Sequence, residues 1–140
     1  MKAKMKKVSI LLIITFLVSG CMAVQRLTMS DIRNEKYFYK SYVLDKKLIE
    51  IAEILYEFGQ RCRPLPNLTI EPTSKKRGYI SWKRYFTANP TIIGLMDFSE
   101  NEEGTTTKIN AYWYYTSIDG KLSDRIVSII KSPDECRDLY

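Results

Sequence analysis

The residues of this 140-residue chain best suited to chemistry are three cysteines, 22 lysines and arginines, and 16 acidic residues. The chain has no histidine, which excludes Ser-His-Asp and Cys-His nucleophile arrangements and imidazole metal ligands. Three cysteines are also too few for a Cys-only structural zinc site. We therefore expect no metal site, no cofactor and no catalytic site of an ordinary acid–base type.

The first cysteine, Cys21, follows a segment with the organisation of a leader. Residues 1–7 carry four lysines and no acid, and residues 8–18 are almost entirely apolar. A basic segment, a short apolar segment and a small-residue exit are the three parts of a secretory signal peptide. The apolar run is well short of the ~20 residues that a transmembrane helix needs. The pattern therefore predicts a signal peptide over residues 1–20.

The exit segment, LVSGC over residues 17–21, resembles the lipobox of bacterial lipoproteins, in which an aliphatic residue and two small residues precede a cysteine. The resemblance implies that signal peptidase II cuts before Cys21, that its thiol receives a diacylglyceryl group, and that the new amino terminus is acylated. Two or three acyl chains anchor a protein stably, whereas one chain holds it only marginally. The alternative is ordinary cleavage after Ala23, for which Cys21 and Met22 are poor flanking residues.

The resemblance also bears on location and on charge. In lipoproteins of Gram-negative bacteria, an Asp after the lipidated cysteine tends to retain the protein at the inner membrane. Met22 stands there instead, so we expect the outer membrane, with the domain facing the periplasm; in a Gram-positive source the same anchor implies the cell surface. Loss of the four leader lysines lowers the formal charge from +6 to +2, which removes the main argument for a nucleic-acid partner.

The other two cysteines, Cys62 and Cys136, are an even remainder in an oxidising compartment, and this predicts one disulfide. The pair is separated by 74 positions, for which the chain-entropy estimate of stabilisation is roughly 4 kcal/mol. The alternative is that Cys62, between Arg61 and Arg63, is a reactive thiol of lowered pKa. The chain has no C-x-x-C pattern around it, so the disulfide is favoured.

Two groups of residues are candidates for contact with a partner. The first is a basic group interleaved with aromatic residues, which in the cell envelope would meet lipid headgroups, an anionic polymer or an acidic protein. A solvated turn and a protected strand edge are the alternative. The second is a pair of tyrosines beside Trp113 that would form an aromatic contact surface. The candidate residues are Lys75, Lys76, Arg77, Lys83, Arg84, Tyr112 and Tyr114.

The spacing of apolar residues predicts an α+β fold. Residues 44–60 carry an apolar stripe at helical spacing, and Gly59 and Pro64 end it. Residues 122–132 fit either a second helix or a final strand after a turn at Asp119-Gly120, and their β-branched residues favour the strand. We expect one amphipathic helix on an antiparallel sheet of about four strands. The expected strands cover residues 68–71, 79–86, 91–98 and 107–118.

The predicted organisation has three parts: the lipoprotein signal peptide over residues 1–20, a lipidated N-terminus and tether over residues 21–43, and a small α+β domain over residues 44–140. Within the tether, residues 37–42 are aromatic with interleaved lysine. Such a segment suits either contact close to a membrane or packing on the domain, and the tendency of aromatic residues to be buried favours packing.

The domain itself resembles no family that we recognise. We expect a membrane-anchored bacterial lipoprotein that acts as a non-catalytic binding or accessory protein in the cell envelope. Its expected partners are the membrane, through the lipid on Cys21, and an envelope protein or anionic envelope polymer. One alternative is a small hydrolase of envelope polymers that uses carboxylates among Glu71, Asp97 and Glu100; another is a structural or exclusion-type lipoprotein. The acidic loop over residues 100–104 is expected to be a solvated turn rather than a calcium site.

Overall fold

The computed structural model describes residues 26–85 and 90–136. At its centre is a five-stranded sheet with the strand order β1-β5-β4-β3-β2, and every neighbouring pair is antiparallel. The α+β class is therefore confirmed, with one strand more than expected. The strands are β1 (Phe38–Leu44), β2 (Thr69–Ile70), β3 (Arg77–Tyr85), β4 (Pro90–Glu100) and β5 (Thr107–Trp113).

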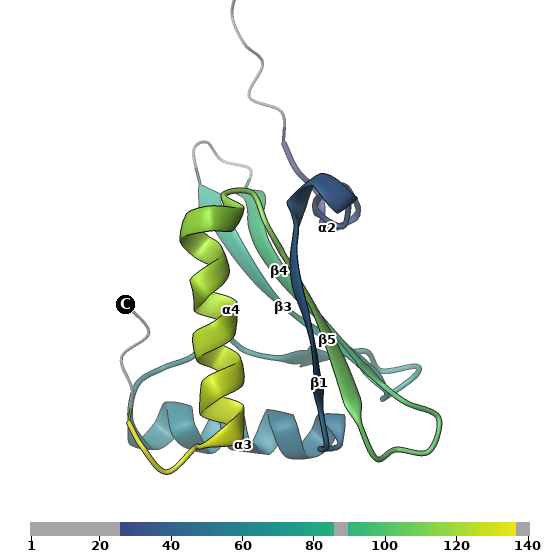
Figure 1. Cartoon of the computed structure of the whole chain (residues 1–140), viewed down its shortest axis with the longest axis vertical. Helices are drawn as coiled ribbons and strands as arrows, with labels where there is room; N and C mark the ends of the chain where they lie inside the picture. The colour runs from purple at the N-terminus through teal and green to yellow at the C-terminus, as the bar shows by residue number, and fades with distance from the viewer. Residues whose placement is uncertain (1–25, 86–89, 137–140) are drawn as a thin grey trace, which may run out of the picture.

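Two long helices, α3 and α4, cover the same face of the sheet (Figure 1). Helix α3 lies across one end of the strands, whereas α4 runs alongside them toward α3. Apolar side chains of both helices and of the inner sheet face form the main core. The helical elements are α2 (Met29–Ile32), the 3-10 turn η1 (Glu35–Tyr37), α3 (Leu48–Arg61) and α4 (Thr116–Lys131).

The helix predicted over residues 44–60 is confirmed as α3, which begins four residues later than expected. Its buried residues are those of the predicted stripe from Leu48 to Phe58. The backbone N–H of Leu48 donates to Oε2 of Glu100 at 2.7 Å, so an acid from β4 satisfies one of the free N–H groups at the start of the helix. The chain leaves the helix at Cys62, two residues before Pro64.

The strand favoured for residues 122–132 is wrong, because these residues belong to α4 up to Lys131. The β-branched residues Ile126, Val127, Ile129 and Ile130 are all buried. In a strand, neighbouring side chains point to opposite faces, so only part of this group would reach the core. In a helix all four reach it, and burial of each at about 1.5–3 kcal/mol outweighs a helix-propensity cost of about half a kcal/mol per residue.

The turn expected at Asp119-Gly120 is also wrong, because both residues lie inside α4. Gly120 has a packing role there rather than a turn role. A Cβ at Gly120 would come within 2.4 Å of the ring of Tyr39, so the missing side chain lets β1 and α4 approach closely. The sequence alone does not distinguish a glycine that ends a helix from one that leaves space for a neighbouring aromatic ring.

The additional strand is β1, formed by residues that we expected to be tether. It pairs with β5 from Lys40 opposite Ala111 to Leu44 opposite Thr107, with a shift of register between Phe38 and Lys40. The aromatic segment around it therefore packs on the domain, as its composition favoured. Because β5 is its only neighbour in the strand order, β1 is an edge strand of the sheet.

The face of the sheet opposite α3 and α4 carries a second, smaller apolar cluster. It includes Leu27 and Ile32 from the N-terminal segment and Ile92 and Leu95 from β4. Both backbone polar groups of Leu27 are hydrogen-bonded to β4. Its N–H donates to Oγ1 of Thr91 at 2.9 Å, and its carbonyl accepts from the N–H of Ile92 at 3.0 Å. The chain is thus attached to the sheet from Leu27 onward.

Candidate functional site

The two cysteines expected to pair do so. Cys62, directly after α3, and Cys136, after α4, form a disulfide with their Cα atoms 5.4 Å apart. The bond ties the C-terminal ends of the two covering helices to each other. The reactive-thiol alternative for Cys62 is therefore not supported. Cys21, the predicted lipidation site, lies outside the described residues.

The predicted basic group is divided between the two ends of β3. Lys75 and Lys76 lie in the turn before the strand, and Nζ of Lys76 donates to the backbone carbonyl of Glu102 at 2.6 Å. Arg77 begins β3, whereas Lys83 and Arg84 lie near its far end. Arg77 and Lys83 are six residues apart, or roughly 20 Å at the rise of a strand. The five residues therefore do not form one continuous patch.

The two candidate tyrosines also separate. Tyr112 lies on β5, on the face opposite α3 and α4, with its ring 5.8 Å from that of Phe38. Burial raises the pKa of Tyr112, and the negative charge of Asp97 adds to the effect. Tyr114 lies beyond the end of β5 and is 47% exposed. Tyr112 and Tyr114 therefore do not share one face of β5, because Tyr114 lies outside the strand.

Four exposed aromatic residues lie instead where elements begin or end at one end of the domain: Phe38, Tyr85, Tyr114 and Tyr115. Here β3 ends and β1, β4 and α4 begin, next to α2. We call this region the tether end; the opposite end, around α3 and the β4–β5 turn, is the α3 end. The tether end comprises residues 26–38 together with Tyr85, Tyr114 and Tyr115.

Ring contacts hold the aromatic residues of the tether end in place. The ring of Tyr37 stacks on that of Tyr114 with 5.7 Å between centroids, and Tyr115 meets Tyr114 edge-on at 4.8 Å. The ammonium group of Lys36 lies 4.6 Å from the ring centre of Tyr37, a cation–π distance. Tyr37 is buried, whereas Tyr114 and Tyr115 remain about half exposed.

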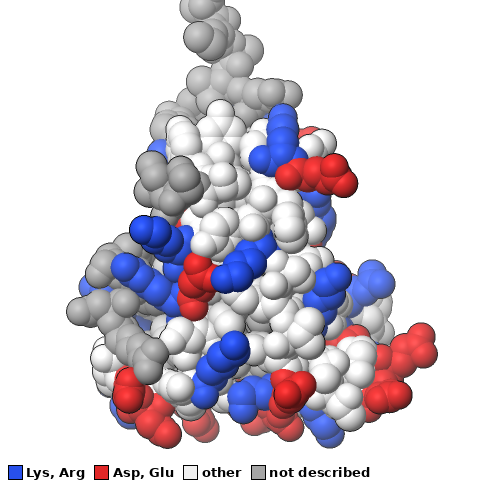
Figure 2. Space-filling model, viewed as in Figure 1, with Lys and Arg blue, Asp and Glu red and all other residues white. Residues whose placement is uncertain are grey.

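Charge is unevenly distributed along the domain. Figure 2 shows acidic side chains mainly toward the α3 end of the face it presents, whereas lysines and arginines extend over its whole height. At the α3 end, Glu53, Glu57 and the turn residues Glu102 and Glu103 are exposed. The exposed charged residues of the tether end are the acids Asp31 and Glu35 and a larger number of basic residues. These basic residues are Arg26, Arg33 and Lys36, with Lys83 and Arg84 close by on β3.

The remaining part of the sheet face opposite α3 and α4 is polar, and we call it the open face. Its central feature is an ion pair in which Nε and Nη2 of Arg33 donate to the two carboxylate oxygens of Asp97 at 2.6 and 2.8 Å. The hydrogen bonds to Asp97 raise the pKa of Arg33. Ser41 donates to Oδ1 of Asn110 at 2.9 Å beside it. The open face comprises Ser41, Val43, Arg77, Tyr79, Ser81, Asp97, Ser99, Lys108, Asn110 and Tyr112, of which Val43 is an exposed apolar residue.

Of the three carboxylates considered for hydrolysis, Asp97 and Glu100 lie on opposite sides of the sheet. Asp97 lies on the open face, with both oxygens bound by Arg33. Glu100, three residues further along β4, reaches the helix-covered side and accepts from the N–H of Leu48. Glu71 follows β2 and is near enough to Arg33 to interact with its charge. Two carboxylates on opposite sides of one sheet cannot flank the same glycosidic bond.

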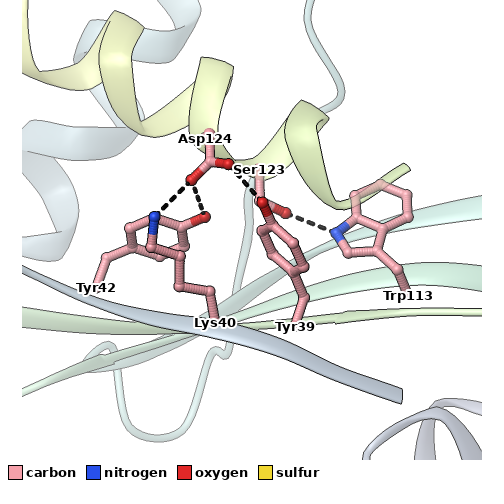
Figure 3. A network of polar contacts seen from close by, with 6 residues as sticks. All are labelled: Tyr39, Lys40, Tyr42, Trp113, Ser123 and Asp124. Atoms are coloured by element: carbon pink, nitrogen blue, oxygen red, sulfur yellow. Dashed lines mark hydrogen bonds and ion pairs between the residues drawn. The ribbon is translucent and has the colours of Figure 1, made fainter. Parts of the chain in front are cut away.

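A polar network between β1 and α4 has Asp124 at its centre (Figure 3). The hydroxyl groups of Tyr39 and Tyr42 donate to its carboxylate at 2.6 and 2.8 Å, and Nζ of Lys40 donates at 3.0 Å. Burial alone would raise the pKa of Asp124, but these three hydrogen bonds and the Lys40 charge outweigh it and lower that pKa. Burial and the bond to Asp124 raise the pKa of Tyr42. The network joins the edge strand to the helix and has a structural role.

Sequence reasoning gave no functional role to Arg33, Asp124 or Tyr115, and it named Tyr85 only as an aromatic residue interleaved with the basic group. Arg33 and Asp97 are 64 positions apart, and Lys40 and Asp124 are 84 apart, so no local pattern reveals either pair. The signals for the tether end were Tyr114, Lys83 and Arg84 among the candidate contacts and the alternation of aromatic residues and lysine over residues 37–42.

Several comparisons complete the description. Within the described parts of the chain, no helix combines the length and apolarity needed to cross a membrane. Residues 26–85 and 90–136 also contain no group of three or more cysteine or acidic residues placed to hold a metal ion. Comparison with protein-family models, with curated proteins and with solved structures found no match to the chain.

Proposed function

We propose that this chain is a lipid-anchored protein of the bacterial cell envelope that binds a partner and does not catalyse a reaction. The observation that carries the proposal is how closely the folded domain follows the lipobox-like segment. Cys21 is six positions before Leu27, which is already buried and bound to β4. An extended chain of this length reaches about 20 Å, so a lipid on Cys21 would hold the domain at the membrane surface.

Anchoring of this kind favours a binding or accessory role, because it confines the domain to the layer where envelope partners lie and raises its local concentration there. Met22, which is not the acidic residue associated with inner-membrane retention, supports the outer membrane as the location. The open face supplies polar and aromatic side chains for contact with an envelope protein or an anionic envelope polymer. The separation of Asp97 from Glu100 on opposite sides of β4 favours binding over hydrolysis.

The anchor is tested by substituting Cys21→Ser in the producing bacterium. We expect an unprocessed precursor that takes up no labelled palmitate, because the substituted residue has no thiol to acylate. The matched control is Cys62→Ser, which also removes a thiol but leaves the lipobox intact and should be processed and labelled normally. Normal processing and labelling of the Cys21→Ser variant would overturn the lipoprotein proposal.

The location and the binding role have separate tests. Met22→Asp is expected to move the lipidated protein from the outer-membrane to the inner-membrane fraction of a Gram-negative host. For binding, the full lipidated protein is crosslinked in intact cells and its partners are recovered. A partner that is lost with Lys108→Glu on the open face, but retained with Lys131→Glu at the end of α4, would support the open face as the contact. Cleavage of an envelope polymer that Asp97→Asn abolishes would instead favour the hydrolase.

A further inference from the structure

We propose that the tether end docks directly on the headgroup layer of the bilayer, so that a protein surface as well as the lipid holds the domain in one orientation. The inference rests on the lipid anchor proposed above and concerns the surface that the domain turns toward the membrane. It commits to one occupant, a bilayer containing anionic lipid.

The first argument is the reach of the chain. The lipidated residue lies at most about 20 Å from Leu27, and Leu27 is bound to Thr91 and Ile92 at the beginning of β4. From Ile92, the remaining eight residues of β4 lead to the α3 end, a distance of roughly 27 Å at the rise of a strand. The tether therefore cannot let the domain contact the bilayer through its α3 end alone. The tether end is the end that the anchor brings to the membrane.

The second argument is the chemistry of that end. Tyrosine rings are enriched where membrane proteins meet the headgroup layer, because they combine an apolar ring with a polar hydroxyl. Tyr85, Tyr114 and Tyr115 are 69%, 47% and 48% exposed at the tether end. Phe38, the first residue of β1, is 44% exposed and adds an apolar ring at this end of the domain. A soluble domain gains nothing from exposing these rings in water, whereas an interface accommodates both parts of each tyrosine.

The third argument is charge complementarity. Basic side chains near a membrane are attracted to anionic headgroups, and Arg26, Lys36 and Lys83 are exposed at or next to the tether end. Acidic residues are concentrated at the other end, as Figure 2 shows for one face. An anionic bilayer would therefore attract the tether end, where exposed basic residues outnumber Asp31 and Glu35. The α3 end carries exposed lysines as well as its glutamates, so the excess of basic residues at the tether end favours the orientation that the tether already imposes.

The fourth argument is the rigidity of the docking surface. The ring of Tyr114 contacts the rings of both Tyr37 and Tyr115. The carbonyl of Tyr115 accepts from the N–H of Asp119 in the first turn of α4, and the N–H of Tyr114 donates to Ile93. The rings are therefore already ordered, and docking them costs little additional conformational entropy.

The test uses the full lipidated protein, purified from membranes with its disulfide oxidised and reconstituted in phospholipid nanodiscs. An environment-sensitive fluorophore is attached to Ser30→Cys in α2 or to Ser74→Cys in the turn before β3. Both serines are exposed, and neither substitution removes a docking tyrosine. The nanodiscs contain phosphatidylcholine with or without phosphatidylglycerol, and a fraction of the lipids carries a nitroxide quencher on the headgroup.

We expect headgroup quenching several-fold stronger at position 30 than at position 74, and stronger still when phosphatidylglycerol is present. The double variant Tyr85→Ser/Tyr115→Ser should weaken quenching at position 30. The matched control Tyr56→Ser should not, since Tyr56 has the same 69% exposure as Tyr85 but belongs to α3. Unchanged quenching in the double variant would overturn the role given to the tyrosines.

The remaining outcomes separate this inference from the proposed function. Equal or absent quenching at both positions, in protein that carries palmitate and stays in the nanodisc, overturns docking and leaves the lipid anchor intact. Absence of palmitate overturns both. Quenching at position 30 that falls as protein density rises, together with crosslinks between copies, would assign the tether end to a second copy of the chain and overturn the bilayer as its occupant.

Discussion

Gly94 lies directly beneath the indole ring of Trp113, its register partner on the neighbouring strand. A Cβ added to Gly94 would come within 2.1 Å of Cζ3 of that ring. The ring is unable to move aside, because it is buried, packs against Trp82 at 4.6 Å between centroids and donates from Nε1 to Oγ of Ser123 at 2.6 Å. The glycine therefore provides the space in which β5 and α4 are joined by this hydrogen bond.

Gly94→Ala should destabilise the domain strongly. We expect a loss of about 2–3 kcal/mol or more in the free energy of unfolding, since a methyl group inserted into a packed core forces side chains or backbone to shift. The measurement is urea denaturation followed by circular dichroism. Gly59→Ala is the matched control, because its Cβ would lie 3.6 Å from the nearest atom. Alanine at this helical position should raise the free energy of unfolding by about 0.5–1 kcal/mol. Equal effects of the two substitutions would contradict the role of Gly94.

Cys62→Ser should remove about 4 kcal/mol of stability, the chain-entropy value for a closed loop of 74 positions. Cys136→Ser should cost the same, and the double variant should cost no more than either single one, because all three lose the same bond. On a non-reducing gel the wild type should migrate faster than each variant, and reductant should abolish the difference. A double variant with a clearly larger loss would show that the cysteines stabilise the domain in another way.

Local patterns in the sequence were sufficient for the elements whose period is unambiguous. The stripe from Leu48 to Phe58 predicts α3, and the alternation around Ile80 and Ile109 predicts the inner positions of β3 and β5. The even cysteine count was likewise sufficient for the disulfide. In each case the residues that form the feature either lie next to each other in the chain or have only one available partner.

The errors arise where tertiary contacts decide. The β-branched residues between positions 126 and 130 have strand propensity, but only a helix brings all four of them to the core that α4 shares with α3 and the sheet. Gly120 has the pattern of a turn residue, and nothing local reveals that the ring of Tyr39, 81 positions earlier, lies against it. The basic residues look like one patch because adjacency in sequence does not show that β3 carries them to its opposite ends. The sequence does not reveal the pairing of Arg33 with Asp97 for the same reason, since the two residues are 64 positions apart.

Glu100→Ala should destabilise α3 through its N-terminus. The substitution leaves the N–H of Leu48 without the acceptor that lies 2.7 Å away, and loss of a capping interaction costs about 1 kcal/mol. The matched control is Glu103→Ala in the adjacent turn, which removes the same charge from an exposed position and should change stability by less than about 0.5 kcal/mol. Chemical denaturation of both variants measures the difference, and indistinguishable midpoints would contradict the cap.

Asp124→Asn tests the network that joins β1 to α4. The folded-state pKa of Asp124 is lowered, so its carboxylate contributes stability above the pKa of an unfolded Asp, about 3.9. That contribution is lost as the pH falls through the lower folded pKa. At pH 7 we expect the variant to be less stable by about 1 kcal/mol, a modest value because the Asp124 side chain is 38% exposed and water screens the ion pair with Lys40.

The pH dependence separates the charge of Asp124 from its shape. Asparagine keeps a carbonyl oxygen that can accept from Tyr39 or Tyr42 but has no charge to pair with Lys40. The stability difference between wild type and variant should therefore be largest near neutral pH and shrink as the pH falls below about 4. Glu103→Gln, which removes a charge from an exposed turn residue, should show a much smaller difference over the same range. A difference for Asp124→Asn that stays constant on acidification would mean that packing, and not the carboxylate charge, joins the edge strand to α4.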